Sequence, residues 1–136
     1  LDGQCVHVAW TGLRDGIKAE SDVGPGCEVK FEKPSLVIYS CRTPSPAQGQ
    51  GFYTHVLKQL IADGHKSGWD VWVTCRSENT ASKLGIQKAG FEFVHRATRR
   101  RCLRLFENKT VQPASSITNG VAEATDPGSR PFVKQV

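Results

Sequence analysis

The chain has 136 residues, a hydrophobic fraction of 38% and a formal net charge of +5, which fit one domain with one modest core. No apolar run approaches the ~20 residues that a bilayer crossing needs, and no signal segment opens the chain, so we expect no membrane association. The five cysteines are widely spaced and form no C-x-x-C pair, which argues against a disulfide framework or a bound metal. These features predict a cytoplasmic protein whose positive charge favours an anionic partner.

Three strands are predicted in the N-terminal third. Val6, Val8 and Trp10 alternate with more polar residues and predict a half-buried strand that ends at Gly12. After a turn-rich segment at residues 22–26, residues 28–31 predict a short strand of opposite direction. Residues 36–41 are rich in β-branched and aromatic side chains and lie between two prolines, so they predict a strand that is buried on both faces and central in the sheet.

The most informative segment is a glycine loop, residues 48–52, with the sequence Gln-Gly-Gln-Gly-Phe. Apolar residues recur at helical spacing behind it, so a helix begins at the glycines and ends near Gly64. The apolar face of this helix comprises Phe52, Val56, Leu57, Leu60 and Ile61. The first N–H groups of a helix lack intrahelical partners, and glycines let a pyrophosphate approach them closely. Taken alone, the loop fits a plain turn equally well.

A second strand and helix follow. Residues 71–75 predict a strand parallel to the 36–41 strand, and residues 79–90 predict a helix that starts at Asn79 and stops at Gly90. Residues 91–94 and 102–106 predict a closing hairpin around Thr98 and a run of arginines. The sequence therefore predicts a single α+β domain at residues 1–106, with a mixed, mostly antiparallel sheet, a central parallel strand pair and flanking helices.

From residue 107 onward the composition shifts to Pro, Ser, Thr, Gly and Asn, which predicts a C-terminal tail at residues 107–136. Val121, Phe132 and Val133 are the apolar residues that could hold this tail against the body or against a neighbouring chain. A homo-oligomer formed through the tail is therefore one expectation.

The order and spacing of the glycine loop and the 79–90 helix resemble those of the GCN5-related N-acetyltransferases (the GNAT superfamily). In that family a strand, a (Q/R)-G-x-G/A loop, a helix, a second strand and an N-x-x-(A/S)…K-x-G-F helix form the acetyl-CoA site. The resemblance covers about residues 36–106 and implies that the strands at 36–43 and 71–75 splay apart to admit the pantetheine arm. The family's usual N-terminal strand and helices have no counterpart here, and the chain has no methionine, so we expect a fragment, a processed chain or an incomplete record.

The resemblance also implies which residues bind acetyl-CoA. Backbone amides at the end of the 36–43 strand would meet the pantetheine arm, and the glycine loop would bind the pyrophosphate. Asn79 would contact the arm in addition to capping its helix, and Ser82 stands where the motif has Ala or Ser. The implied cofactor-binding residues are Cys41, Arg42, Thr43, Gln48, Gly49, Gln50, Gly51, Phe52, Asn79 and Ser82.

Two departures from the family pattern affect the chemistry. Pro46 stands where the longer motif has Gln or Arg, so the pyrophosphate loses one side-chain donor. Ile86 stands where many members have the tyrosine that protonates the CoA thiolate, so the resemblance implies that residue 86 faces the sulfur without supplying a general acid. The helix also contains Gly85, which indicates a close approach by the acyl arm or by a strand. Candidate substitute donors are Tyr53, Cys75 and a water, and candidate bases acting through water are His55, Glu78 and His95. No catalytic residue is identified from the sequence.

A dense cluster of basic residues comprises Arg96, Arg99, Arg100, Arg101 and Arg104. It fits a solvated hairpin tip, a contact with the 3′-phosphate of CoA, or a contact with nucleic acid. No stacking aromatic residue lies between Val94 and Cys102, which makes nucleic acid the weakest of the three.

The sequence therefore predicts an acetyl-CoA-dependent N-acetyltransferase that acts on an unidentified small-molecule or peptide amine. One alternative is a GNAT-fold protein that binds CoA without catalysis. The other is a basic nucleic-acid-binding domain that uses the arginine cluster.

Overall fold

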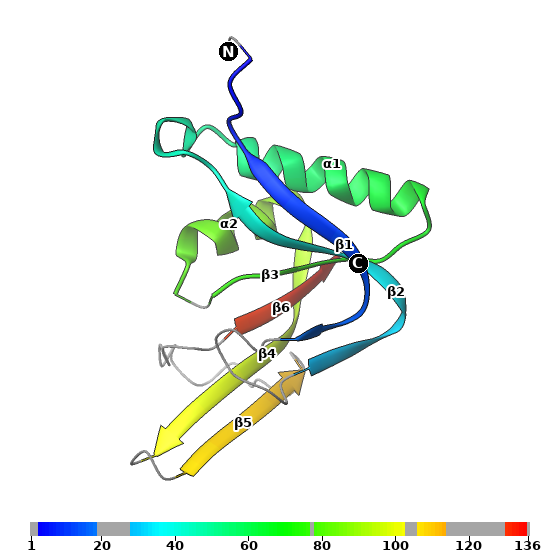
Figure 1. Ribbon diagram of the computed structural model, residues 1–136, viewed down its shortest axis with the longest axis vertical. Coiled ribbons are helices and arrows are strands. Elements are labelled where there is room, and N and C mark those ends of the chain that lie inside the picture. Colours follow the sequence, from blue (N-terminus) through cyan, green and yellow to red (C-terminus); the bar gives the residue numbers. More distant parts are fainter. Residues whose placement is uncertain (1–2, 19–27, 77, 103–105, 114–129, 136) are drawn as a thin grey trace.

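The computed structural model describes residues 3–18, 28–76, 78–102, 106–113 and 130–135. The fold is α+β, with the helices α1 (Phe52–Lys66) and α2 (Thr80–Ala89) and a six-stranded sheet in the order β1-β2-β3-β6-β4-β5 (Figure 1). The strands are β1 (Val8–Lys18), β2 (Glu28–Arg42), β3 (Val71–Thr74), β4 (Phe91–Cys102), β5 (Phe106–Pro113) and β6 (Arg130–Gln135). Only β2 and β3 pair in parallel, and the other neighbours are antiparallel. The predicted mixed sheet with one parallel pair is therefore confirmed.

The first two strands form a long antiparallel hairpin whose bounds differ from the prediction. β1 begins at Val8 and runs through Gly12 to Lys18, and the two strands predicted within residues 28–41 are one continuous strand, β2. The register changes after the Arg14–Ser35 pair, so that residues 31–34 form an irregularity in β2. Pro34 lies within it, where a missing backbone N–H breaks no ladder hydrogen bond. The expected turn at residues 22–26 lies outside the described residues.

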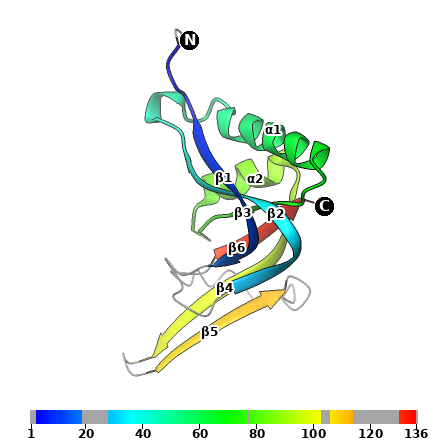
Figure 2. The ribbon, with the colours of Figure 1, turned by 45° about the vertical axis from the view of Figure 1, so that its right-hand side comes forward.

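Both helices pack on one face of the sheet. The core on this face comprises Leu36, Ile38, Leu57, Ile61, Val71, Val73, Ile86, Ala89 and Phe91. On the opposite face, Val37 and Trp72 are buried with Ile17 and Val29, because the far half of the β1–β2 hairpin bends across that face (Figure 2). Alternate residues of β2 and β3 thus point into two cores. This confirms that the middle of the predicted central strand is buried on both faces.

The predicted closing hairpin around Thr98 is wrong. β4 continues from Phe91 to Cys102 and pairs with β5 from His95–Pro113 to Cys102–Phe106, so the arginines at 96 and 99–101 lie within a strand. Residues 91–106 contain no Gly, Pro, Asn or Asp, and so no residue type that favours a turn at Thr98. The far halves of β4 and β5 extend away from both helices (Figures 1 and 2). Arg104 lies outside the described residues.

The sheet also continues beyond the predicted domain boundary at residue 106. β5 covers residues up to Pro113, and β6 is inserted between β3 and β4, where Val133 pairs with both Val73 and Phe93. Phe132 and Val133, which were expected to hold a tail, therefore belong to the sheet of the same chain. Residues 114–129, which include Val121, lie outside the described residues.

Candidate functional site

The glycine loop has the backbone conformation that only glycine adopts easily. Gly49 has a φ of 75° and Gly51 a φ of 83°, both in the left-handed region. No heavy atom of the described residues lies within 4 Å of a Cβ built at either position, so the requirement is conformational and the adjoining space is open. Gly51 is the N-cap of α1, and within the described residues no side chain caps this helix and no acidic residue lies in its first turn. The positive end of α1 is therefore accessible to an anion.

The side chains of two glutamines that were predicted to bind the cofactor also hold the loop. Gln48 Nε2 donates to the backbone oxygen of Thr43 at 3.0 Å, and Gln50 Nε2 donates to that of Pro46 at 2.8 Å. A short 3₁₀ turn, η1 (Ser45–Ala47), precedes them. These bonds and the prolines fix the loop before any ligand arrives, which reduces the entropy lost on binding.

The parallel pairing between β2 and β3 ends before β2 itself does. Paired residues run from Leu36–Val71 to Ile38–Val73, and β2 continues to Arg42 with only β1 as its strand partner among the described residues. There Ser40 and Cys41 together lie opposite one residue of β1, which is a β-bulge, and Ser40 has a φ of 52°. A non-glycine residue at positive φ is strained, and such strain is concentrated at functional sites.

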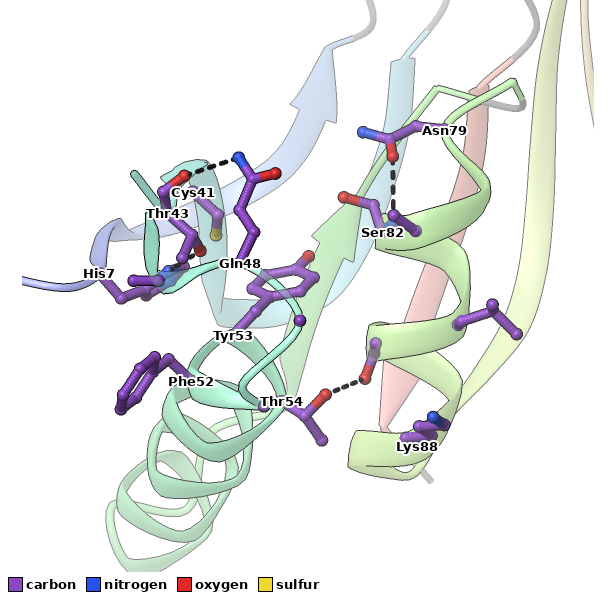
Figure 3. A pocket seen from close by; sticks show the side chains of 16 residues that line it. His7, Cys41, Thr43, Gln48, Phe52, Tyr53, Thr54, Asn79, Ser82 and Lys88 are labelled. Carbon is purple, nitrogen blue, oxygen red and sulfur yellow. Dashed lines mark hydrogen bonds between the residues drawn. The ribbon is translucent and has the colours of Figure 1, made fainter. Parts of the chain in front are cut away.

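The loop, the end of β2 and α2 enclose a pocket of about 560 Å³, here called the first pocket (Figure 3). Of the predicted cofactor-binding residues, it is lined by Cys41, Thr43, Gln48, Gly49, Gly51, Phe52, Asn79 and Ser82. Arg42 lines a neighbouring second pocket, and the side-chain amide of Gln50 points to the loop backbone. The Phe52 ring points away from α2, so its backbone is the part beside the loop (Figure 3). The first pocket is also lined by His7, Ala47, Tyr53, Thr54, Ala81, Leu84, Gly85 and Lys88, which were outside the predicted set.

The N-terminus of α2 borders the same pocket. Asn79 Oδ1 accepts a hydrogen bond from the backbone N–H of Ser82 at 3.0 Å, which confirms the predicted cap. Gly90 ends α2 with a φ of 99°, as its position in the pattern predicts. The predicted helix is therefore confirmed at both ends.

Gly85 allows α1 and α2 to touch through the ring of Tyr53. A Cβ at residue 85 would lie 2.7 Å from Tyr53 Cδ1, and Thr54 Oγ1 donates to the Gly85 oxygen at 3.4 Å. The close approach at Gly85 is thus made by a side chain of α1. The Tyr53 side chain lines the first pocket, and its hydroxyl points into the space between the glycine loop and α2 (Figure 3). Burial raises the pKa of Tyr53 above its usual range, so the phenol stays neutral and can donate a proton.

Ile86 does not face the pocket, which contradicts its expected position beside the cofactor sulfur. Its side chain is 1% exposed and packs in the core with Leu57 and Phe91. Of the three substitute donors considered, Tyr53 is the side chain that lines the first pocket.

Ile86→Tyr is therefore expected to lower the free energy of unfolding by about 1–3 kcal/mol, because a larger polar side chain would overpack the core. Urea denaturation would measure this loss. Leu84→Tyr is the matched control on the same helix, since Leu84 is half exposed, and we expect a change within about 0.5 kcal/mol. An unchanged midpoint for Ile86→Tyr would contradict its burial in the core.

Cys41 lines the pocket as a neutral thiol. Burial raises the pKa of Cys41 and of Cys75 to about 11, whereas Cys5 is exposed. At pH 8 about one in a thousand molecules carries the thiolate at a pKa near 11, against roughly a quarter for an ordinary thiol. Neither side chain is therefore a ready nucleophile near neutral pH.

Alkylation of Cys41 and Cys75 by iodoacetamide at pH 8 should be about 100-fold slower than that of Cys5, because the thiolate is the reactive form. Both rates should rise about tenfold per pH unit until the pH nears 11. Peptide mass spectrometry resolves the three sites. Equal labelling of Cys41 and Cys5 at pH 8 would show that Cys41 is not buried.

His7 is a pocket residue that the sequence did not indicate. Its Nδ1 shares a hydrogen bond of 2.7 Å with Thr43 Oγ1, and its ring centroid lies 5.6 Å from that of Tyr53. Its Nε2 is buried and has no hydrogen-bond partner among the described residues. Burial lowers the pKa of His7, so the imidazole is neutral near pH 7 and can accept a proton. The sequence suggested three other residues as bases. Two of them, His55 and Glu78, are exposed and line neither pocket. The side chain of the third, His95, lies outside the described part.

Comparisons of the chain with family profiles, with curated proteins and with solved structures find no match. No helix in the described ranges is long and apolar enough to cross a membrane. Within the same ranges, no three His, Cys, Asp or Glu side chains gather where they could hold a metal ion. The function is therefore argued from the geometry of the first pocket.

Proposed function

We propose that this protein binds acetyl-CoA in the first pocket and transfers the acetyl group to an amine. The observation that carries the proposal is the convergence of three features on one pocket. These are the accessible N-terminus of α1, the capped N-terminus of α2 and the end of β2 beyond its pairing with β3. A pocket of about 560 Å³ is within the range of small-molecule sites.

The backbone amides at the start of α1 would bind the pyrophosphate, since they lie at the positive end of the helix dipole. Lys88 lines the same pocket and would add a cation for a phosphate group. The strand end at Ser40–Arg42 has no partner on its β3 side among the described residues, so it offers its backbone to the amide groups of the pantetheine arm. This is the arrangement that the resemblance to GNAT proteins implies.

Tyr53 supports a catalytic role over binding alone. In the proposed reaction a neutral amine attacks the thioester carbonyl, the C–N bond forms and the C–S bond breaks. The leaving thiolate needs a proton, and the Tyr53 hydroxyl is a buried, neutral donor on the pocket wall. The carbonyl oxygen would be polarised by backbone N–H groups of the β2 bulge.

Calorimetry with acetyl-CoA and with CoA tests the proposal, and we expect dissociation constants in the micromolar range. Acetyl-CoA at a hundredfold excess over its dissociation constant should stabilise the fold by about 2.7 kcal/mol. Release of free thiol with a panel of amines then separates a transferase from a protein that only binds CoA. Absence of heat and of thermal stabilisation at millimolar acetyl-CoA would refute the proposal, and tight salt-dependent RNA binding would favour the nucleic-acid alternative.

A further inference from the structure

A second pocket, of about 470 Å³, adjoins the first pocket across the end of β2. Cys41, Thr43 and Gln48 line both pockets, so the two share a wall. If acetyl-CoA lies in the first pocket, its acetyl group reaches this wall, because the backbone around Cys41 is where the pantetheine arm would run. An acceptor in the second pocket would then be next to the reacting carbonyl carbon.

Among the described residues that line the second pocket, Arg42 is the one with a charged side chain. The remaining residues that line it alone are Cys5, Val8 and Pro44, which are weakly polar or apolar. A guanidinium can bind a carboxylate through two parallel hydrogen bonds, whereas an ammonium group lacks this planar pair of donors. The lining therefore fits a small molecule with one anionic end and otherwise little charge.

His7 lies at the boundary between the two pockets. It lines the first pocket, whereas Cys5 and Val8 on either side of it in sequence line the second. Its Nδ1 is held by Thr43, which lines both pockets, so the ring is oriented by the shared wall. A buried imidazole nitrogen without a partner is unfavourable, and an N–H of a bound amine would supply that partner to Nε2.

We propose that the acceptor is a small amine that carries a carboxylate, bound in the second pocket with its carboxylate at Arg42 and its amine beside His7. The inference rests on the proposed acetyl transfer. As the C–N bond forms and the C–S bond breaks, the amine loses a proton to His7 Nε2 and the sulfur gains one from Tyr53. The products are an N-acetylated amino acid and CoA with a free thiol.

The test compares matched acceptors by thiol release with the full chain. Alanine, β-alanine and 4-aminobutyrate are each paired with an alkylamine of equal length, and 2-aminoethylphosphonate tests whether any anion suffices. We expect kcat/KM at least tenfold higher for the best carboxylated amine than for its neutral partner, since hydrogen bonds to charged groups are worth ~1.5–3 kcal/mol. Arg42→Gln should remove this preference through KM and leave the dissociation constant of acetyl-CoA unchanged. Arg14→Gln, an exposed change outside both pockets, should leave all of these values unchanged.

His7→Ala should lower kcat by about 10²–10⁴-fold with every amine, and added imidazole should restore part of the loss, which a structural role would not explain. Weaker acetyl-CoA binding in Arg42→Gln would assign Arg42 to the cosubstrate and overturn the inference. Equal turnover of carboxylated and neutral amines, or a preference for the phosphonate, would also overturn it while leaving the proposed acetyl transfer intact. A parent protein that binds no acetyl-CoA would instead refute the proposed function itself, and this inference with it.

Discussion

Gly51→Glu is expected to lower the affinity for acetyl-CoA by at least about 100-fold while the domain remains folded. The new carboxylate would stand at the N-cap of α1, where the pyrophosphate is proposed to accept backbone hydrogen bonds. Loss of two such bonds to a charged group, each worth ~1.5–3 kcal/mol, accounts for that change. The left-handed conformation at residue 51 adds about 1–2 kcal/mol of strain, and the open space around it prevents a steric clash.

The matched control is Gly68→Glu. Gly68 has a φ of 74° and equally open surroundings, and it follows the opposite end of α1. The Gly68→Glu variant introduces the same charge and the same backbone strain, and its affinity for acetyl-CoA should be unchanged. Gly51→Ala isolates the strain at the loop itself. Calorimetry and circular dichroism supply the measurements, and a folded Gly51→Glu protein with parental affinity would place the pyrophosphate elsewhere.

The elements that the sequence predicts best have local signals at one or both ends. α1 starts directly after the left-handed Gly51, and α2 lies between its cap Asn79 and the left-handed Gly90. Each signal depends on neighbouring residues alone, so tertiary contacts do not alter it. The parallel pairing of β2 and β3 follows in the same way from two apolar runs joined by a helix.

Elements set by distant contacts were missed. β6 contains Pro131 and Lys134, and it becomes a strand because it fills the gap between β3 and β4. Its pairing partners are separated from it by long stretches of sequence, which no local pattern encodes. His7 likewise lies before the first strand, and only the folded hairpin brings it to Thr43 at the end of β2.

Which side of α2 packs against the sheet also depends on contacts that are distant in the sequence. Helical spacing fixes the angles between residues but leaves the rotation of the whole helix open. That rotation is set by Tyr53, whose ring packs against Gly85 and turns the next residue, Ile86, toward the sheet. The proposed proton donor, Tyr53, therefore lies on α1, at a position where the resemblance carried no functional residue.

Tyr53→Phe is expected to lower kcat by about 10²–10⁴-fold with any accepted amine, while the affinity for acetyl-CoA stays near the parental value. In the proposed reaction the hydroxyl acts on the departing sulfur in the transition state, so its loss should change the rate more than it changes binding. Phenylalanine keeps the ring that packs on Gly85, and the fold should persist. Because burial raises the pKa of Tyr53 above its usual value, kcat should not decline through loss of this proton until the pH exceeds about 10.

The control for Tyr53→Phe is Tyr39→Phe, at the only other tyrosine of the chain, which is exposed and lines neither pocket. It should leave kcat unchanged. Gly85→Ala offers an independent route to the same loss, since its Cβ would lie 2.7 Å from Tyr53 Cδ1 and displace the ring from α2. Thiol release under saturating acetyl-CoA measures all three variants. If Tyr53→Phe kept the parental kcat and Cys41→Ala were inactive, the proton donor would be Cys41 at the end of β2 and not Tyr53. Cys41 could serve because burial keeps its thiol protonated and it lines the same pocket.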